Sequence, residues 1–218
     1  MADFATDSFT GTDGTELSAY SANWVRHSAG SASGINAQLI GGRVRPSGSG
    51  VALYYHSGSP PSADYSVVAD IYEASEPTNY GTGPVGRLDI TANTMYHARH
   101  VKINAAGKNG WELLKIVAGT QTLLGAYAAD DITTGTSAQV ELRMTGTTIE
   151  LYKRGESTPT ISGTDSSITA AGKAGFRIGF NGGNTPSDTT LYLLDNFAAV
   201  DSGGDVTNRF LLLMGVGT

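Results

Sequence analysis

The spacing of apolar residues constrains the fold of this chain more than any other feature. Between positions 65 and 72, Tyr65, Val67, Ala69 and Ile71 alternate with more polar side chains. Alternation with a period of two is typical of an antiparallel strand that buries one face. The same pattern recurs at 140–144, 149–152 and 176–180, and further strands are expected at 52–56, 95–103, 111–117 and 191–200.

Helical periodicity is nearly absent, and segments rich in Gly, Ser and Thr separate the expected strands. Many short strands with such turns predict an all-β fold, in which two antiparallel sheets pack as a sandwich or jelly roll. A chain of 218 residues is long enough for one such domain. We expect the domain to occupy residues 1–201. A Gly-rich linker and an apolar C-terminal tail follow at 202–218.

The composition excludes several classes of protein. An apolar fraction of 39%, with 10 Tyr and 6 Phe, supplies a hydrophobic core and argues against disorder. The formal net charge is −6 and the basic residues are scattered, so no basic tract is available to bind nucleic acid. The chain contains no Cys, which excludes disulfides, thiolate catalysis and cysteine zinc sites.

The two ends of the sequence carry no targeting signal that we recognise. The first residues form neither the basic nor the apolar region of a signal peptide. The aliphatic run at 211–214 is too short to span a bilayer. We therefore expect a protein that is made in the cytoplasm and is not inserted into a membrane.

Several short motifs follow one another in a distinctive order. They are Asp7-Ser8-Phe9, the segment 13–17, Trp24, the segments 111–115, 140–151 and 165–176, and Leu194-Asp195-Asn196-Phe197. Together they resemble the concanavalin A-like lectin/glucanase family, in particular its laminin G-like domains. The resemblance covers about residues 4–200 of this chain. The resemblance implies a jelly roll of two curved antiparallel sheets. Domains of this kind are also similar to phage virion accessory proteins.

The resemblance does not extend to catalytic residues. The family's glucanases carry Glu-x-Asp-x-x-Glu on one strand, so that one carboxyl protonates the leaving oxygen while another attacks. In this sequence no Asp or Glu is followed two residues later by another, and Glu73 and Glu76 are three apart. We therefore predict that the protein is not an enzyme. A glycoside hydrolase or lyase of another arrangement is the second alternative.

His97 and His100 form an H-x-x-H pattern, which suggests a metal site only if the pair shares a face. Two residues three apart on a strand point to opposite faces. We therefore interpret both histidines as structural.

One structural calcium ion is implied by the family resemblance. Related sandwiches bind an ion through carboxylates on the first and last strands, and the matching residues here are Asp7 and Asp195, with Asp13 nearby in sequence. Carboxylates and backbone carbonyls are ligands that Ca²⁺ prefers. The alternative is that these side chains only accept hydrogen bonds from loop amides.

A carbohydrate site needs aromatic rings beside polar groups. Three pairs of residues two apart share a strand face and have this chemistry: Tyr54 with His56, Asp70 with Tyr72, and His97 with Arg99. If their strands are neighbours on the concave sheet, the six form a glycan-binding surface. The alternative is ordinary strand composition, since Tyr is favoured in sheets.

These observations favour a non-enzymatic structural or binding module with glycan-binding capacity. We predict a phage virion accessory protein, either a capsid decoration or a tail or fibre appendage, located in the virion with other virion proteins as partners. A free carbohydrate-binding lectin is the first alternative.

The tail carries five consecutive large apolar residues. They are Phe210, Leu211, Leu212, Leu213 and Met214. Exposed apolar runs of this size bind something or aggregate. The tail can return to its own domain, or it can add to a neighbouring subunit by strand addition. We predict the second arrangement and a homo-oligomer, with a trimer as the first guess.

Overall fold

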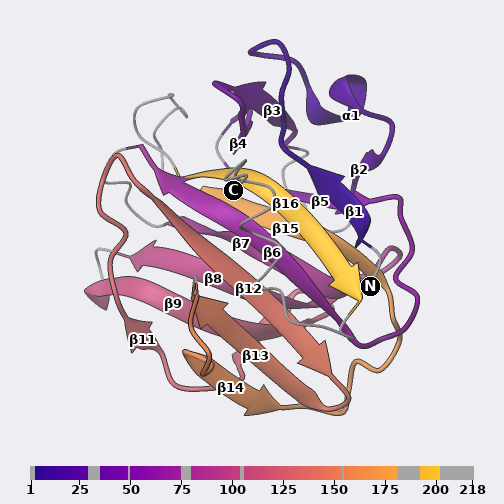
Figure 1. Cartoon of the computed structure of the whole chain (residues 1–218), viewed down its shortest axis with the longest axis vertical. Coiled ribbons are helices and arrows are strands. Elements are labelled where there is room, and N and C mark those ends of the chain that lie inside the picture. Colours follow the sequence, from indigo (N-terminus) through magenta and orange to yellow (C-terminus); the bar gives the residue numbers. More distant parts are fainter. Residues whose placement is uncertain are drawn as a thin grey trace, which may run out of the picture.

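The computed structural model describes residues 3–28, 35–48, 50–74, 80–103, 106–153, 155–180 and 192–201. Two antiparallel sheets of eight strands each lie face to face, which confirms the predicted all-β sandwich (Figure 1). Within the described ranges one short helix occurs, α1 (Leu17–Tyr20). No helix in these ranges is long and apolar enough to cross a membrane.

Sheet A contains the chain's first strand and its last described strand. Its order is β14 (Ile161–Thr164), β13 (Thr148–Lys153), β12 (Ser137–Thr145), β6 (Tyr65–Glu73), β16 (Tyr192–Asp201), β4 (Arg43–Pro46) and β3 (Ala37–Ile40), with β1 (Asp3–Asp7) also paired to β16. The strand β16 is described as far as Asp201, the last of the described residues. The tail residues 210–214 lie outside the described residues.

Sheet B forms the second layer. Its order is β10 (Thr120–Leu123), β9 (Lys108–Val117), β8 (Thr94–Ile103), β7 (Tyr80–Asp89), β15 (Lys173–Phe180), β5 (Gly50–His56) and β2 (Trp24–Arg26), with β11 (Ala128–Ala129) also paired to β9. In Figure 1 sheet A lies in front of sheet B.

The core lies between the two sheets and is built from the alternating apolar rows. Tyr65, Val67, Ala69 and Ile71 of β6 are all buried in it, as the sequence predicts. Aromatic rings fill one part of the core, where Trp24 lies 4.9 Å from Phe197 and 5.1 Å from Phe176, measured between ring centroids. Burying each such side chain contributes roughly 1.5–3 kcal/mol, so these rows hold the two sheets together.

Sheet B also carries apolar side chains on its other face. Six buried residues form a second cluster there, separate from the main core, which we call the outer cluster: Leu53, Val85, Leu88, Met95, Leu114 and Ile116. Three of them alternate with residues of the main core: Leu53 precedes Tyr54, Met95 precedes Tyr96, and Leu114 follows Leu113. The outer cluster therefore faces away from sheet A.

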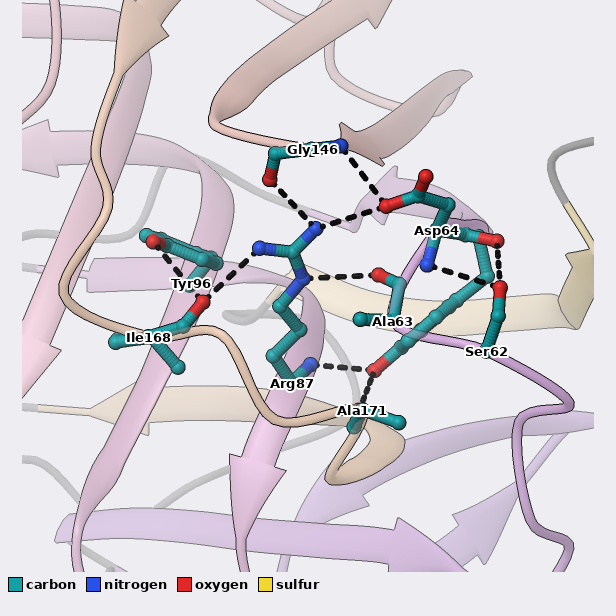
Figure 2. Close-up of polar contacts among 9 residues, drawn as sticks. Ser62, Ala63, Asp64, Arg87, Tyr96, Gly146, Ile168 and Ala171 are labelled. Atoms are coloured by element: carbon teal, nitrogen blue, oxygen red, sulfur yellow. Dashed lines mark hydrogen bonds and ion pairs between the residues drawn. The ribbon is translucent and has the colours of Figure 1, made fainter.

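Arg87 joins three loops at one end of the sandwich (Figure 2). Its side chain is 2% exposed. The residue lies at a bulge that interrupts the regular pairing of β7 with β8, and its φ there is 48°. The guanidinium donates to the carbonyl oxygens of Ala63, Gly146 and Ile168, each at 2.9 Å, and contacts Asp64 Oδ1 at 3.3 Å. Because these acceptors come from three separate loops, Arg87 fixes the shape of that end.

His100 packs between the sheets within the core. Its ring lies 4.8 Å from the ring of Trp111 and 5.1 Å from that of Tyr192, and Nε2 is 3.0 Å from the carbonyl oxygen of Asp130. Burial lowers the pKa of His100 from 6.5 to about 4. The histidine is therefore neutral in the folded protein at neutral pH.

We expect Arg87→Lys to lower the free energy of unfolding by about 2–4 kcal/mol. A lysine ammonium lacks the planar fork of donors, so buried carbonyl oxygens lose their partners. Urea denaturation measures the change. Arg143→Lys, which alters a partly exposed ion pair with Glu141, is the matched control and should cost less than about 1 kcal/mol. Equal losses in the two variants would contradict the role given to Arg87.

The protein should lose stability as the pH falls from about 6.5 to about 4, since the unfolded chain takes up a proton on His100 that the folded chain excludes. The contribution from His100 is at most about 3 kcal/mol. His100→Gln keeps a donor for the Asp130 carbonyl but cannot titrate. Its unfolding free energy, measured by denaturation at several pH values, should depend less on pH in this range. An unchanged slope would contradict the assignment.

Candidate functional site

The six residues expected to form a glycan-binding surface lie on three different faces. Tyr54 and His56 are on β5 and point between the sheets, so the prediction is wrong for this pair. Tyr54 is 0% exposed, and its hydroxyl accepts a hydrogen bond from the backbone N–H of Ala37 at 3.3 Å. The ring of His56 packs edge-on against Trp24, with centroids 5.3 Å apart. Both side chains belong to the core.

His97 and Arg99 share a face as predicted, on the outer side of sheet B. His97 is 0% exposed, and burial holds its pKa well below its usual range. The Arg99 guanidinium donates twice to Glu112 Oε2, at 3.0 and 2.6 Å, while Lys108 Nζ binds Glu112 Oε1 at 2.7 Å. His97 is inaccessible and Arg99 is already paired, so this pair is poorly placed to bind a ligand. His100 points to the opposite face, as expected of a structural pair.

Asp70 and Tyr72 lie half-buried on the outer face of sheet A. Strand pairing places Asp195 of β16 opposite Asp70 on one side and Gln139 of β12 opposite it on the other. Across the sheet, the guanidinium of Arg43 lies 4.1 Å from the ring centroid of Tyr72. We call these residues, together with Asn196, the bulge cluster: Arg43, Asp70, Tyr72, Gln139, Asp195 and Asn196.

A β-bulge in β16 creates this cluster. The pairing of β16 with β6 shifts after Asp195, where Asn196 has a φ of 48°. The extra residue lets Asp195 and Asn196 both face outward, while Leu194 and Phe197 on either side are buried in the core. Asn196 Nδ2 donates to Asp70 Oδ2 at 2.9 Å, and Gln139 Nε2 donates to Asp70 Oδ1 at 2.9 Å.

Two carboxylates that face each other across a strand pair repel one another. Burial raises the pKa of Asp195, the charges of Asp70 and Asp7 raise it further, and Arg43 opposes the rise. The backbone N–H of Asn196 donates to Asp195 Oδ1 at 2.7 Å. The cluster thus combines a ring, amides, carboxylates and a guanidinium, all half-buried on one outer face, which is the chemistry that binds sugar hydroxyls.

Sequence spacing identifies only part of the bulge cluster. Asp70 and Tyr72 follow from the alternation along β6, and Asp195 was singled out for a different role. Arg43, Gln139 and Asn196 were missed, because their proximity depends on the order of the strands and on the bulge. An Asp-Asn pair next to a strand's apolar row is the only local signal for such a bulge.

The three aspartates expected to bind calcium do not form one group among the described residues, although Asp7 lies close enough to Asp195 for its charge to raise the pKa of that carboxyl. The first and last strands are paired as predicted, with Asp7 opposite Phe197. Asp7 Oδ1 accepts from the N–H of Phe9 and the hydroxyl of Tyr20, and Oδ2 accepts from Trp24 Nε1. Asp13 Oδ1 accepts from the N–H of Gly41.

Asp7 accepts three hydrogen bonds from protein groups, as the alternative interpretation of these side chains predicts. Within the part of the chain that the structure describes, no three acidic or histidine side chains are grouped to hold a metal. Calcium binding stays an untested prediction.

An open pocket of about 420 Å³ lies beside Arg87, between the end of β7 and the loop before β15. Leu88, Ile90 and Ile168 supply apolar walls. The polar groups at its rim are engaged elsewhere: Asp89 Oδ1 caps the N–H groups of Thr91 and Ala92, and Lys173 Nζ donates to the carbonyl of Ser57 at 2.7 Å. The pocket therefore offers less recognition chemistry than the bulge cluster.

The chain matches no family model, and no curated protein is similar to it in sequence. Its fold is similar to those of several solved structures. The carbohydrate-binding module CBM66 from Bacillus subtilis has a TM-score of 0.58 at 15% identity, covering 82% of this chain and 96% of that one. A Bacillus subtilis protein of unknown function with a galectin-like fold has a TM-score of 0.62 at 11% identity, covering 92% of this chain and 96% of that one.

The GH43 protein BlXynB from Bacillus licheniformis has a TM-score of 0.56 at 13% identity, covering 90% of this chain but only 39% of that longer chain. At these identities the likeness concerns the fold alone. The chain is therefore a jelly-roll β-sandwich of the architecture seen in a carbohydrate-binding module and a galectin-like protein.

Proposed function

We propose that this chain is a non-enzymatic carbohydrate-binding module and that the bulge cluster is its binding site. The observation that carries the proposal is the convergence of an aromatic ring with amide, carboxylate and guanidinium groups on the outer face of sheet A. A fold shared with a carbohydrate-binding module supports it.

The geometry suggests how a sugar would be held. Arg43 fixes the ring of Tyr72, leaving its remaining surface for the apolar face of a pyranose or furanose. Asp70 is held in place by two amide donors, Gln139 and Asn196, so its orientation is set before a ligand arrives. Preorganised polar groups of this kind bind hydroxyls with little loss of side-chain entropy.

The same face also contains the strongest argument for a hydrolase. Side chains directly opposite on paired strands have Cβ atoms about 4.5–5.5 Å apart, close to the carboxyl separation of about 5–5.5 Å in retaining glycosidases. The raised pKa of Asp195 would suit a general acid. However, both oxygens of Asp70 accept hydrogen bonds from amides, which weakens it as a nucleophile. We therefore favour binding without hydrolysis.

A glycan array probed with the intact chain tests the proposal and should give at least one class of bound glycan. Tyr72→Ala and Gln139→Ala should each weaken binding about tenfold, equivalent to about 1.4 kcal/mol. Gln121→Ala, on the exposed edge strand β10 of the other sheet, is the matched control and should bind normally. The bound glycan should release no reducing ends during incubation.

Three results would contradict the proposal: no glycan bound, full binding by both cluster variants, or reducing-end release that Asp195→Asn abolishes. The last result would replace the binding module with a glycosidase.

We also propose, from the family resemblance, that the module works in a phage virion as a capsid decoration or a tail or fibre appendage. A glycan-binding face is useful to such an appendage, which must hold on to a surface. The expected result is co-sedimentation of the protein with purified particles, seen by mass spectrometry and by electron microscopy of labelled protein. Glycan binding without particle association would instead support a free lectin.

A further inference from the structure

Arg177 of β15 carries a positive charge on the outer face of sheet B. Phe176 and Ile178 on either side of it are buried in the core, so its own side chain points away from sheet A. The residue is half-buried, and its guanidinium makes no hydrogen bond or ion pair with any of the residues that the structure describes. Burial and the nearby charge of Arg99 lower the pKa of Arg177 from 12.5 to about 10. A desolvated cation that lacks a counter-ion costs folding free energy.

Arg99 of β8 lies on the same face, one strand beyond β7. Gly83 of β7 pairs with Arg177 directly, and the register of β7 with β8 brings it opposite Arg99. Neighbouring strands are about 4.8 Å apart, so the two arginines begin about 10 Å from each other, across a residue without a side chain. The Arg99 side chain bends over β7, because a Cβ on Gly81 would lie 3.1 Å from Arg99 Cδ and 3.3 Å from Nη1.

The charges of the described side chains around these arginines do not balance. Glu112 of β9 is paired with Arg99 and accepts from it at 3.0 and 2.6 Å, while Lys108 Nζ lies 2.7 Å from its other oxygen. One carboxylate therefore serves two cations, and Arg177 is a third. His97 does not offset the excess, because burial and the two arginines hold its pKa well below its usual range and keep it neutral. These side chains together are positively charged.

The positions next to Arg177 carry no side chains, both along its own strand and across β7. They are occupied by four glycines: Gly81, Gly83, Gly175 and Gly179. A glycine inside a strand often marks a place where a ligand comes close to the backbone. On its other side Arg177 pairs with Leu53 of the outer cluster, which is apolar. An apolar neighbour strengthens the attraction between the guanidinium and an anion, since it reduces screening by water.

An oxyanion matches this arrangement better than a neutral group. The planar fork of a guanidinium donates two parallel hydrogen bonds to a carboxylate, sulfate or phosphate. The fork of Arg177 is available for such bonds, whereas Glu112 already holds Arg99 in place. Arg99 therefore adds a fixed second positive charge and Arg177 supplies the donors. A sugar hydroxyl has no charge that would neutralise the pair.

We propose that the outer face of sheet B binds an oxyanion group beside Arg177, with the charge of Arg99 as support. The group is the carboxylate, sulfate or phosphate of a small acidic ligand. The site lies on the opposite sheet from the bulge cluster, so the proposal does not depend on glycan binding there.

Calorimetric titration of the intact chain with sulfate, phosphate and glucuronate, each at constant ionic strength in chloride, tests the proposal. At least one of the three should bind saturably, and the pattern among them shows which oxyanion the site prefers. Arg177→Gln should weaken that binding about tenfold. Arg143→Gln, which removes a partly exposed arginine from sheet A, is the matched control and should bind as the intact chain does. No saturable binding of any of the three, or equal affinities in the two variants, would overturn the proposal.

The stability of the Arg177→Gln variant separates a ligand site from a structural contact. Without oxyanions the variant should unfold at the same urea concentration as the intact chain or at a higher one, because the substitution removes an unneutralised charge. A variant that unfolds at a clearly lower urea concentration would show that Arg177 holds the fold together, and would overturn the proposal.

Chemical modification tests the site without a substitution. Phenylglyoxal reacts with accessible guanidinium groups, and mass spectrometry measures the rate at each arginine. Arg177 should react in chloride, and the oxyanion that binds best should slow its reaction several-fold. Arg143 should react equally fast in both buffers. A guanidinium of Arg177 that fails to react in chloride, or reacts as fast with the oxyanion present, would overturn the proposal.

Discussion

Sheet B carries apolar side chains on both of its faces, and a two-layer sandwich can bury only one of them. Its inner face packs against sheet A, whereas Leu53, Met95, Leu114 and their neighbours face outward. Burying one such side chain is worth about 1.5–3 kcal/mol, so six of them left in water would forgo about 9–18 kcal/mol, which is an upper estimate. That amount is comparable with the whole stability of a typical domain, about 5–15 kcal/mol. Keeping the outer cluster out of water therefore matters to the fold as well as the core between the sheets.

This asymmetry assigns different tasks to the two outer faces. Sheet A presents polar groups, and the bulge in β16 concentrates them by turning two successive residues outward. The opposed carboxylates of Asp70 and Asp195 cost some stability, about 0.2–1 kcal/mol for like charges across a strand pair. Amide donors and Arg43 offset that cost. A polar arrangement that the fold itself does not require is a reasonable place to look for ligand binding.

The sequence predicts the architecture better than the site, for physical reasons. Alternation in β6 assigns Val67 and Ile71 to the core and Asp70 and Tyr72 to the outside, and the structure confirms both. In β5 the run 52–56 has no polar face, so alternation could not tell whether Tyr54 or Tyr55 points inward. Residues brought together by strand order cannot be found from spacing along one strand.

Hydroxyl-radical footprinting of the intact chain tests the central claim, that the bulge cluster on sheet A is accessible whereas the outer cluster of sheet B is buried. Oxidation rates, corrected for the intrinsic reactivity of each residue type, should be high at Tyr72 and at the exposed Leu123. They should be low at Leu53, Met95 and Leu114, although these side chains point away from the other sheet. Rates at the outer cluster that equal the rate at Leu123 would show that sheet B is open, and would contradict the account.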